Sequence, residues 1–135
     1  MAVLVVCVLS AGCFWRSYGA RMDMHTDLLL SMTHKGADLV RGHRFAPENL
    51  PELLYPLDRA REFAARAHRH GAADPPASLG AFDALLAAYA EFCRIADDLR
   101  HAGGDVPDGS RLSGAVDGVE GAAGAVRRAL AAEGR

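Results

Sequence analysis

The pattern of hydrophobic and polar positions divides the chain into a short apolar part and a longer amphipathic part. Met1 to Trp15 form a run without a charged residue, and the run stops at Arg16. As a helix rising 1.5 Å per residue, this run would be about 22 Å long, whereas the hydrocarbon core of a membrane is about 30 Å thick. The pattern therefore predicts that residues 1–18 form an apolar anchor or signal-like helix that is short for a membrane span.

Three aromatic residues, Phe14, Trp15 and Tyr18, lie where this run ends. Arg16 and Arg21 stand beside them. Together they have the composition of the aromatic belt and basic flank at the interfacial end of a membrane helix. Because basic residues follow the run and none precedes it, the positive-inside rule would place the rest of the chain in the cytoplasm. An uncleaved anchor is one expectation for the N-terminal run.

Beyond the run, apolar residues recur every three or four positions in four stretches, which is the spacing that places them on one face of a helix. The stretches cover residues 21–43, 50–70, 78–101 and 110–130, and glycine and proline lie between them. No stretch alternates apolar and polar residues as a strand does. We therefore predict an all-α protein, in which the apolar anchor helix precedes a small antiparallel bundle of three to four helices over residues 19–135.

The helical periodicity also predicts which side chains face the core. In the first stretch these are Met24, Leu28, Met32 and Leu39, with His25, Leu29 and Gly36 on the margin of the same face. In the second they are Leu53, Leu57, Ala60, Ala64 and Ala67. In the third, which has the clearest pattern, they are Leu79, Phe82, Leu86, Tyr89, Cys93 and Ala96. In the last they are Leu112, Val116, Val119, Ala123, Val126 and Leu130. Pro56 should either kink the second helix or begin its main segment.

The last stretch has a second face, made of glycine. Gly114, Gly118, Gly121 and Gly124 cluster opposite its apolar stripe. A glycine inside a helix costs about 1 kcal/mol relative to alanine, so the helix either frays or is stabilised from outside. Close approach of another helix along this face, as in the small-xxx-small seams of packed helices, would offset the cost. The alternative is a loosely ordered helix whose glycines have no role.

Composition and charge narrow the choice of partner. The formal net charge is -2 with both signs interspersed, and no basic block offers the footprint of a nucleic-acid-binding protein. Nucleic acid is therefore not expected as a partner. Cys7, Cys13 and Cys93 form neither a disulfide framework nor a CxxC motif.

The residues around Cys13 raise a second interpretation of the N-terminal run, in which it is a signal that is removed. The residues Leu9-Ser10-Ala11-Gly12-Cys13 resemble a bacterial lipoprotein signal, in which small residues precede a cysteine that is lipidated and becomes the mature N-terminus. Ser10 stands where leucine is usual, and no basic residue precedes the run. The resemblance implies lipidation at Cys13 and a domain outside the cytoplasmic membrane. An uncleaved anchor, a lipidated Cys13, and cleavage or burial of the run all stay open, and with them the side of the membrane.

One cluster has side chains suited to a metal. Thioethers and imidazole are ligands for Cu(I), and Met24, His25 and Met32 can share one face of a helix. The competing interpretation is that methionines at helical spacing pack in the core. For an enzyme, the chain shows no glycine loop after a strand, no HExxH, no nucleophile elbow and no pair of Glu-x-x-His motifs.

These observations favour a protein without a catalytic site or a cofactor. The expected function is that of a membrane-tethered interaction or scaffolding protein. Its partners would be the membrane and either another protein or a second copy of the chain, bound through the glycine face of the last helix. The alternative is an envelope copper-binding protein that uses Met24, His25 and Met32.

Overall fold

The chain folds into four α-helices joined by short connections. The computed structural model describes the backbone of residues 2–71, 73–102 and 109–135, and the side chains within these ranges except those of residues 2–11 and 102. The helices are α1 (Ala2–Arg41), α2 (Asn49–His70), α3 (Ala77–Ala102) and α4 (Gly109–Ala132). No strand occurs in the described ranges, so the predicted all-α fold is confirmed.

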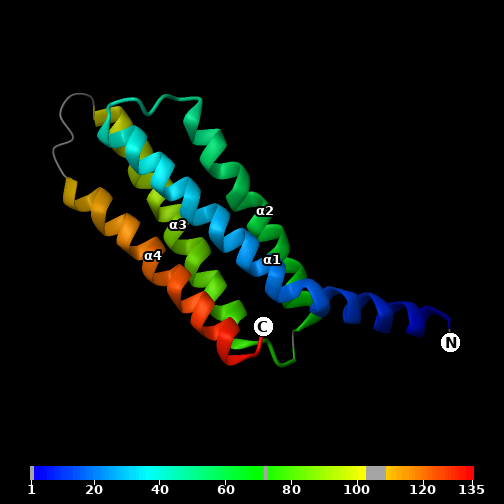
Figure 1. Cartoon of the computed structure of the whole chain (residues 1–135). Coiled ribbons are helices and arrows are strands. Elements are labelled where there is room, and N and C mark those ends of the chain that lie inside the picture. Colours follow the sequence, from blue (N-terminus) through cyan, green and yellow to red (C-terminus); the bar gives the residue numbers. More distant parts are fainter. Residues whose placement is uncertain (1, 72, 103–108) are drawn as a thin grey trace.

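Consecutive helices run in opposite directions, which gives the bundle an up-down-up-down order (Figure 1). Helix α1 contacts each of the other three helices, and α3 contacts both α2 and α4. The interface between α3 and α4 is the most extensive, whereas α2 and α4 share no contact within the described residues. The predicted antiparallel bundle is therefore present, with α1 and α3 meeting across its centre.

Helix α1 is 40 residues long and contains both the apolar run and the first amphipathic stretch. No break separates the two. The N-terminal part of α1 projects beyond the bundle, at the end where the α2–α3 connection and the C-terminus lie (Figure 1). Over the residues whose side chains are described, no helix is long and apolar enough to cross a membrane.

The predicted core faces of α2, α3 and α4 are confirmed, because every residue named for these three helices is buried. Helix α3 also buries Leu85, Phe92 and Ile95. These additional positions widen its apolar face, as expected for a helix that packs against the three others. The periodicity of the sequence was therefore sufficient to orient three of the four helices.

The core face predicted for α1 is wrong for Met24 and Leu28, whereas Met32 and Leu39 are partly buried and pack against the core. Met24 and Leu28 are 55% and 43% exposed. The face that packs into the bundle consists of Phe14, Tyr18, Met22, His25, Leu29, Thr33, Ala37 and Val40. It can include threonine because a threonine in a helix satisfies its hydroxyl on a carbonyl one turn earlier. Thr33 Oγ1 donates to Leu29 O at 2.8 Å, so this polar side chain is buried without an unsatisfied group.

The aromatic residues at the end of the apolar run also lie elsewhere than predicted. Phe14 and Tyr18 are buried in the bundle core, and Trp15 packs against it. Their assignment to an interfacial aromatic belt is therefore corrected for Phe14 and Tyr18. The reason is that α2 continues to His70 and covers this turn of α1, where the ring of Phe14 stacks on Phe63 with centroids 5.9 Å apart.

Pro56 lies inside α2 without ending the helix. Its nitrogen has no hydrogen to donate to the carbonyl of Glu52, so this turn lacks one backbone hydrogen bond. The hydroxyl of Tyr89 reaches the same turn from α3 and donates to Leu53 O at 2.7 Å. Burial raises the pKa of Tyr89, so its hydroxyl keeps the proton that this bond requires. The bond joins α2 to α3 inside the core.

We expect Tyr89→Phe to lower the free energy of unfolding by about 1 kcal/mol, because it removes this buried hydrogen bond and leaves the ring in place. Urea denaturation followed by circular dichroism measures the change. Tyr55→Phe is the matched control, since Tyr55 is 66% exposed and its hydroxyl should matter by less than about 0.5 kcal/mol. Equal midpoints for Tyr89→Phe and the unmodified chain would contradict the role given to this bond.

Candidate functional site

The end of the bundle from which α1 projects gathers arginine side chains from three parts of the chain. We call it the cationic end and define it by Arg16, Arg21, Arg66, Arg69 and Arg135. The first two belong to α1 and the next two to α2, whereas the last follows α4. No basic block is visible in the sequence, because antiparallel packing is what brings these segments to one end (Figure 1).

The ring of Phe14 lies at the centre of the cationic end. It stacks on Phe63 and His70, with ring centroids 5.9 Å and 4.8 Å away. The guanidinium groups of Arg21 and Arg66 lie 6.0 Å and 5.7 Å from the same centroid. A guanidinium at about 6 Å from an aromatic centroid is attracted to the face of the ring. Arg21 lies closer still to the ring of Phe63, at 5.2 Å, so the stacked pair of Phe14 and Phe63 together contacts both cations.

Arg135 covers the aromatic residues on another side of α1. Its guanidinium carbon lies 5.4 Å from the ring centroid of Trp15 and 4.8 Å from that of Tyr18. Gly19 makes room for this approach, because a Cβ atom there would lie 3.0 Å from the Cβ of Arg135. Arg135 also forms an ion pair with Glu133, with Nε and Oε2 3.5 Å apart. The segment after α4 is thereby fixed against α1.

Hydrogen bonds join α1, α3 and the segment after α4 at this end. The hydroxyl of Tyr18 and Oγ of Ser78 lie 2.8 Å apart. The backbone N–H of Ser78 donates to Oε1 of Glu133 at 3.0 Å. Burial raises the pKa of Tyr18, and the hydrogen bond to Ser78 opposes this only in part. The position of Tyr18 is therefore set by both packing and polar contacts.

The first four arginines of the cationic end take part in no ion pair among the described residues. Two of the carboxylates near them are engaged with other groups. Glu133 is paired with Arg135, and Oδ2 of Asp83 lies 2.7 Å from Nε2 of His68. The cationic end therefore carries positive charge that the bundle itself does not neutralise.

A hollow of about 770 Å³ opens beside the cationic end. Trp15, His70 and Arg135 line it, together with Pro75 and Pro76 of the α2–α3 connection. Sites for small molecules are typically about 300 to 1,000 Å³ in volume. The walls combine aromatic and proline surface with one arginine and with the carboxylates of Asp74 and Glu133, so the hollow has an apolar part and a polar part of mixed charge.

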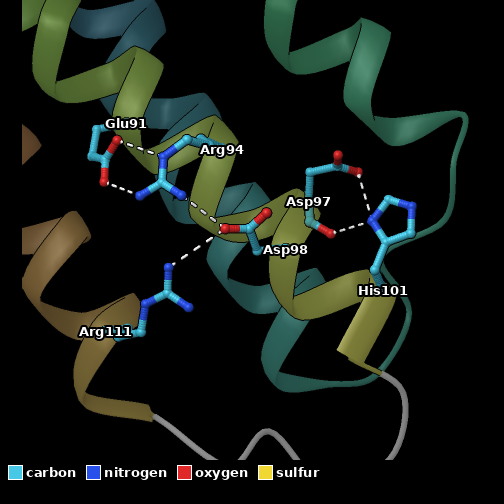
Figure 2. Close-up of polar contacts among 6 residues, drawn as sticks. All are labelled: Glu91, Arg94, Asp97, Asp98, His101 and Arg111. Atoms are coloured by element: carbon cyan, nitrogen blue, oxygen red, sulfur yellow. Dashed lines mark hydrogen bonds and ion pairs between the residues drawn. The ribbon is translucent and has the colours of Figure 1, made fainter.

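In the opposite half of the bundle some charges are paired, although Arg41 and Arg44 belong to no ion pair among the described residues. Figure 2 shows Arg94 between Glu91 and Asp98, with its Nη1 2.8 Å from Oδ2 of Asp98 and its guanidinium bonded to both oxygens of Glu91. The hydrogen bonds from Arg94 lower the pKa of Glu91. Arg111 reaches Asp98 from α4 at 3.5 Å. Pairs of this kind stabilise helix surfaces, and here they also join α4 to α3.

The candidate copper ligands are not brought together. Met24 is mostly exposed, whereas His25 is 8% exposed and lies between the rings of Phe63 and Phe82, at 5.1 Å and 6.3 Å. Burial lowers the pKa of His25, which marks a neutral imidazole packed in the core. Met32 packs on the edge of the core. Within the described residues, no group of three or more His, Cys, Asp or Glu side chains is placed to hold a metal ion.

The glycine face of α4 has no partner helix within the described chain. Gly114, Gly118 and Gly121 are exposed, and Cβ atoms added there would meet nothing within 4 Å. At Gly124 an added Cβ would meet only the side chain of Arg128, at 3.1 Å. The close helix approach that these glycines could permit does not occur inside the bundle. Binding of a protein or of a second copy along this face stays a prediction.

The cysteines whose side chains are described differ sharply in environment. Cys13 is exposed, one residue before the point at which α1 enters the core, whereas Cys93 is buried. Both are free thiols. Burial raises the pKa of Cys93 to about 12, so its thiol stays protonated at neutral pH. Lipidation of Cys13 stays a prediction, and its exposure at the exit of α1 is compatible with it.

Comparison with protein-family models, with curated proteins and with solved structures found no significant match.

We expect Gly118→Ala to raise the free energy of unfolding by about 1 kcal/mol, because alanine favours the helix and its Cβ meets no atom. Gly36→Ala is the contrasting variant. Its Cβ would lie 3.1 Å from the ring of Phe92 and 3.3 Å from Leu53, so we expect a loss of about 1 kcal/mol through overpacking. Urea denaturation of dilute protein measures both. A loss of stability in Gly118→Ala would instead indicate a close contact along the glycine face.

We also expect a maleimide reagent to modify Cys13 in the folded protein and Cys93 only after unfolding. Thiolates are the reacting species, and burial both shields Cys93 and keeps it protonated. Mass spectrometry of peptides from a Cys7→Ser variant separates the two sites. Modification of Cys93 in the native state as fast as that of Cys13 would show that the core opens readily at α3.

Proposed function

We propose that the protein is a membrane-tethered helical bundle whose apolar N-terminal helix inserts into a lipid bilayer. The observation that carries the proposal is the continuity of α1, which joins the apolar run and the bundle core in one helix of 40 residues. A large apolar surface exposed to water promotes association, so a projecting apolar helix requires a partner. A bilayer fits a single, uncharged, helical projection of this kind.

The length of the projection suggests how deeply it inserts. From Ala2 to Cys13 the helix is about 18 Å long at 1.5 Å per residue, which exceeds half of a hydrocarbon core of about 30 Å. Inserted along the membrane normal, it would pass the midplane without crossing. Lipidation of Cys13 is the alternative attachment. The acyl chain would then be linked to the bundle at the point where α1 leaves it. The two modes put the bundle on opposite sides of the cytoplasmic membrane.

The tethered bundle would act as an interaction or scaffolding module. The glycine face of α4 supports this role because it is exposed along the helix and the bundle's own packing does not use it. A partner helix could approach its backbone closely there. Copper binding by Met24, His25 and Met32 has no comparable support, because His25 would have to leave the aromatic core to meet the exposed Met24.

The test of the tether is flotation of the whole chain with vesicles of phosphatidylcholine. We expect the unmodified chain to float with the lipid. A Val5→Asp/Val8→Asp variant should bind at least 100-fold more weakly, because each aspartate in a membrane helix costs about 3 kcal/mol. Circular dichroism checks that the helix content of the bundle is unchanged.

Ala84→Asp/Ala87→Asp is the matched control, because it adds the same charge at exposed positions of α3. This variant should float like the unmodified chain. The tether is rejected if the unmodified chain stays in the lipid-free fraction, or if the Val5→Asp/Val8→Asp variant floats as well as the control.

A further inference from the structure

We propose that the cationic end binds the phosphate groups of anionic phospholipids, so that the bundle rests on the bilayer surface beside the inserted helix. This inference rests on the proposed insertion of α1 and adds the lipid chemistry that the bundle itself recognises. The proposed ligand is a membrane surface because the arginines surround the place where the apolar part of α1 leaves the bundle: they lie on α1 at this place, near the end of α2 and just after α4 (Figure 1).

The positive charge around Phe14 is complementary to an anionic lipid surface. Arg21 and Arg66 both face its ring, with guanidinium carbons 6.0 Å and 5.7 Å from the centroid. Neither arginine belongs to an ion pair among the described residues. An anion bound at this end would neutralise both guanidinium groups. Guanidinium groups bind phosphate oxygens through paired hydrogen bonds.

Arg16 and Arg69 extend the cationic surface away from Phe14. Both are exposed, and Arg16 directly follows Trp15 on the turn that leaves the core. The apolar stem of an arginine can lie against lipid while its guanidinium reaches the headgroups. Tryptophan favours the same interfacial layer. The hollow lined by Trp15, His70 and Arg135 gives a headgroup room beside these side chains.

Opposing charge at this end is small. Glu133 is paired with Arg135, and Asp83 bonds to His68. Asp74, in the α2–α3 connection, is the carboxylate near the hollow that belongs to no ion pair of the described residues. The cationic end is therefore positive, although the chain as a whole has a formal net charge of -2. In the other half of the bundle, Arg94 and Arg111 are paired with carboxylates (Figure 2).

The experiment compares binding of the whole chain to phosphatidylcholine vesicles and to vesicles that also contain phosphatidylglycerol. Each arginine near an anionic surface contributes about fivefold to binding. The four arginines without an ion pair should therefore make binding to the anionic vesicles tighter by about 600-fold at low ionic strength. Added salt should remove most of this difference, because the charges are exposed and screened.

Arg16→Gln/Arg69→Gln is the principal variant, because neither side chain supports the core. It should lose about 30-fold on anionic vesicles and nothing on phosphatidylcholine. The lysine variant Arg16→Lys/Arg69→Lys should keep most of the anionic preference. Arg41→Gln/Arg44→Gln is the matched control, since it removes the same charge from the last residue of α1 and from the connection that follows it, at the opposite end of the bundle.

Each other outcome has a definite meaning. Equal binding to both kinds of vesicle overturns this proposal but not the insertion of α1. An equal loss of binding to anionic vesicles in the Arg41→Gln/Arg44→Gln control has the same meaning. Absence of binding to both kinds of vesicle overturns the tether with it. Displacement from anionic vesicles by inorganic phosphate at constant ionic strength would assign the arginines to a soluble anion. Displacement by duplex DNA, with the same dependence on Arg16 and Arg69, would assign them to nucleic acid.

Discussion

The burial of Phe14 and Tyr18 is the constraint on which the rest of the structure depends. These side chains begin the core face of α1, under α2 and against Ser78 of α3. A bend in α1 at this point would pull both side chains out of a close-packed core and leave cavities. The core therefore sets the direction in which the apolar residues leave the bundle. A surface that binds the apolar residues of α1 would therefore also contact the cationic end of the bundle.

The positive charge at that end has more than one origin. Helices α2 and α4 both finish there, and cations near helix C-termini interact favourably with the helix dipole, which accounts for Arg69 and Arg135. The dipole does not account for Arg16, since α1 neither begins nor ends there, or for Arg66, which lies a turn before the end of α2. The contact of Arg66 with Phe14 fixes its position without neutralising it. The proposed phospholipid phosphate would neutralise these two arginines.

The sequence predicts the fold better than it predicts the face of α1 that packs in the core. In α2, α3 and α4 one apolar stripe stands out, and it is the buried one. In α1 two stripes compete, and hydrophobicity favours the one with Met24 and Leu28. The buried stripe contains His25 and Thr33, whose burial depends on the rings of Phe63 and Phe82 and on a carbonyl one turn away. Those partners are known only once the helices are packed.

The cationic end could not be predicted from the sequence, because it too depends on how the helices pack. Its arginines are scattered singly along the chain, and only the register of antiparallel helices brings them together. A signal did exist, because the start of the first amphipathic stretch and the end of the second must meet in an antiparallel pair. Both of these segments, around Arg16 and around Arg69, are rich in arginine. Joining the two observations required the helix boundaries that the structure supplies.

The proposed tethering would also change how the glycine face of α4 can associate with a partner. The helix cost of its glycines is offset within the bundle, because α4 buries Leu112, Val116, Val119, Ala123, Val126 and Leu130, mostly against α3. The face is therefore already ordered before any partner arrives, which lowers the entropy cost of association. Bundles held upright on one bilayer would present their glycine faces at the same height. Confinement raises the effective concentration of one copy for another, so a seam too weak for free molecules could form between tethered ones.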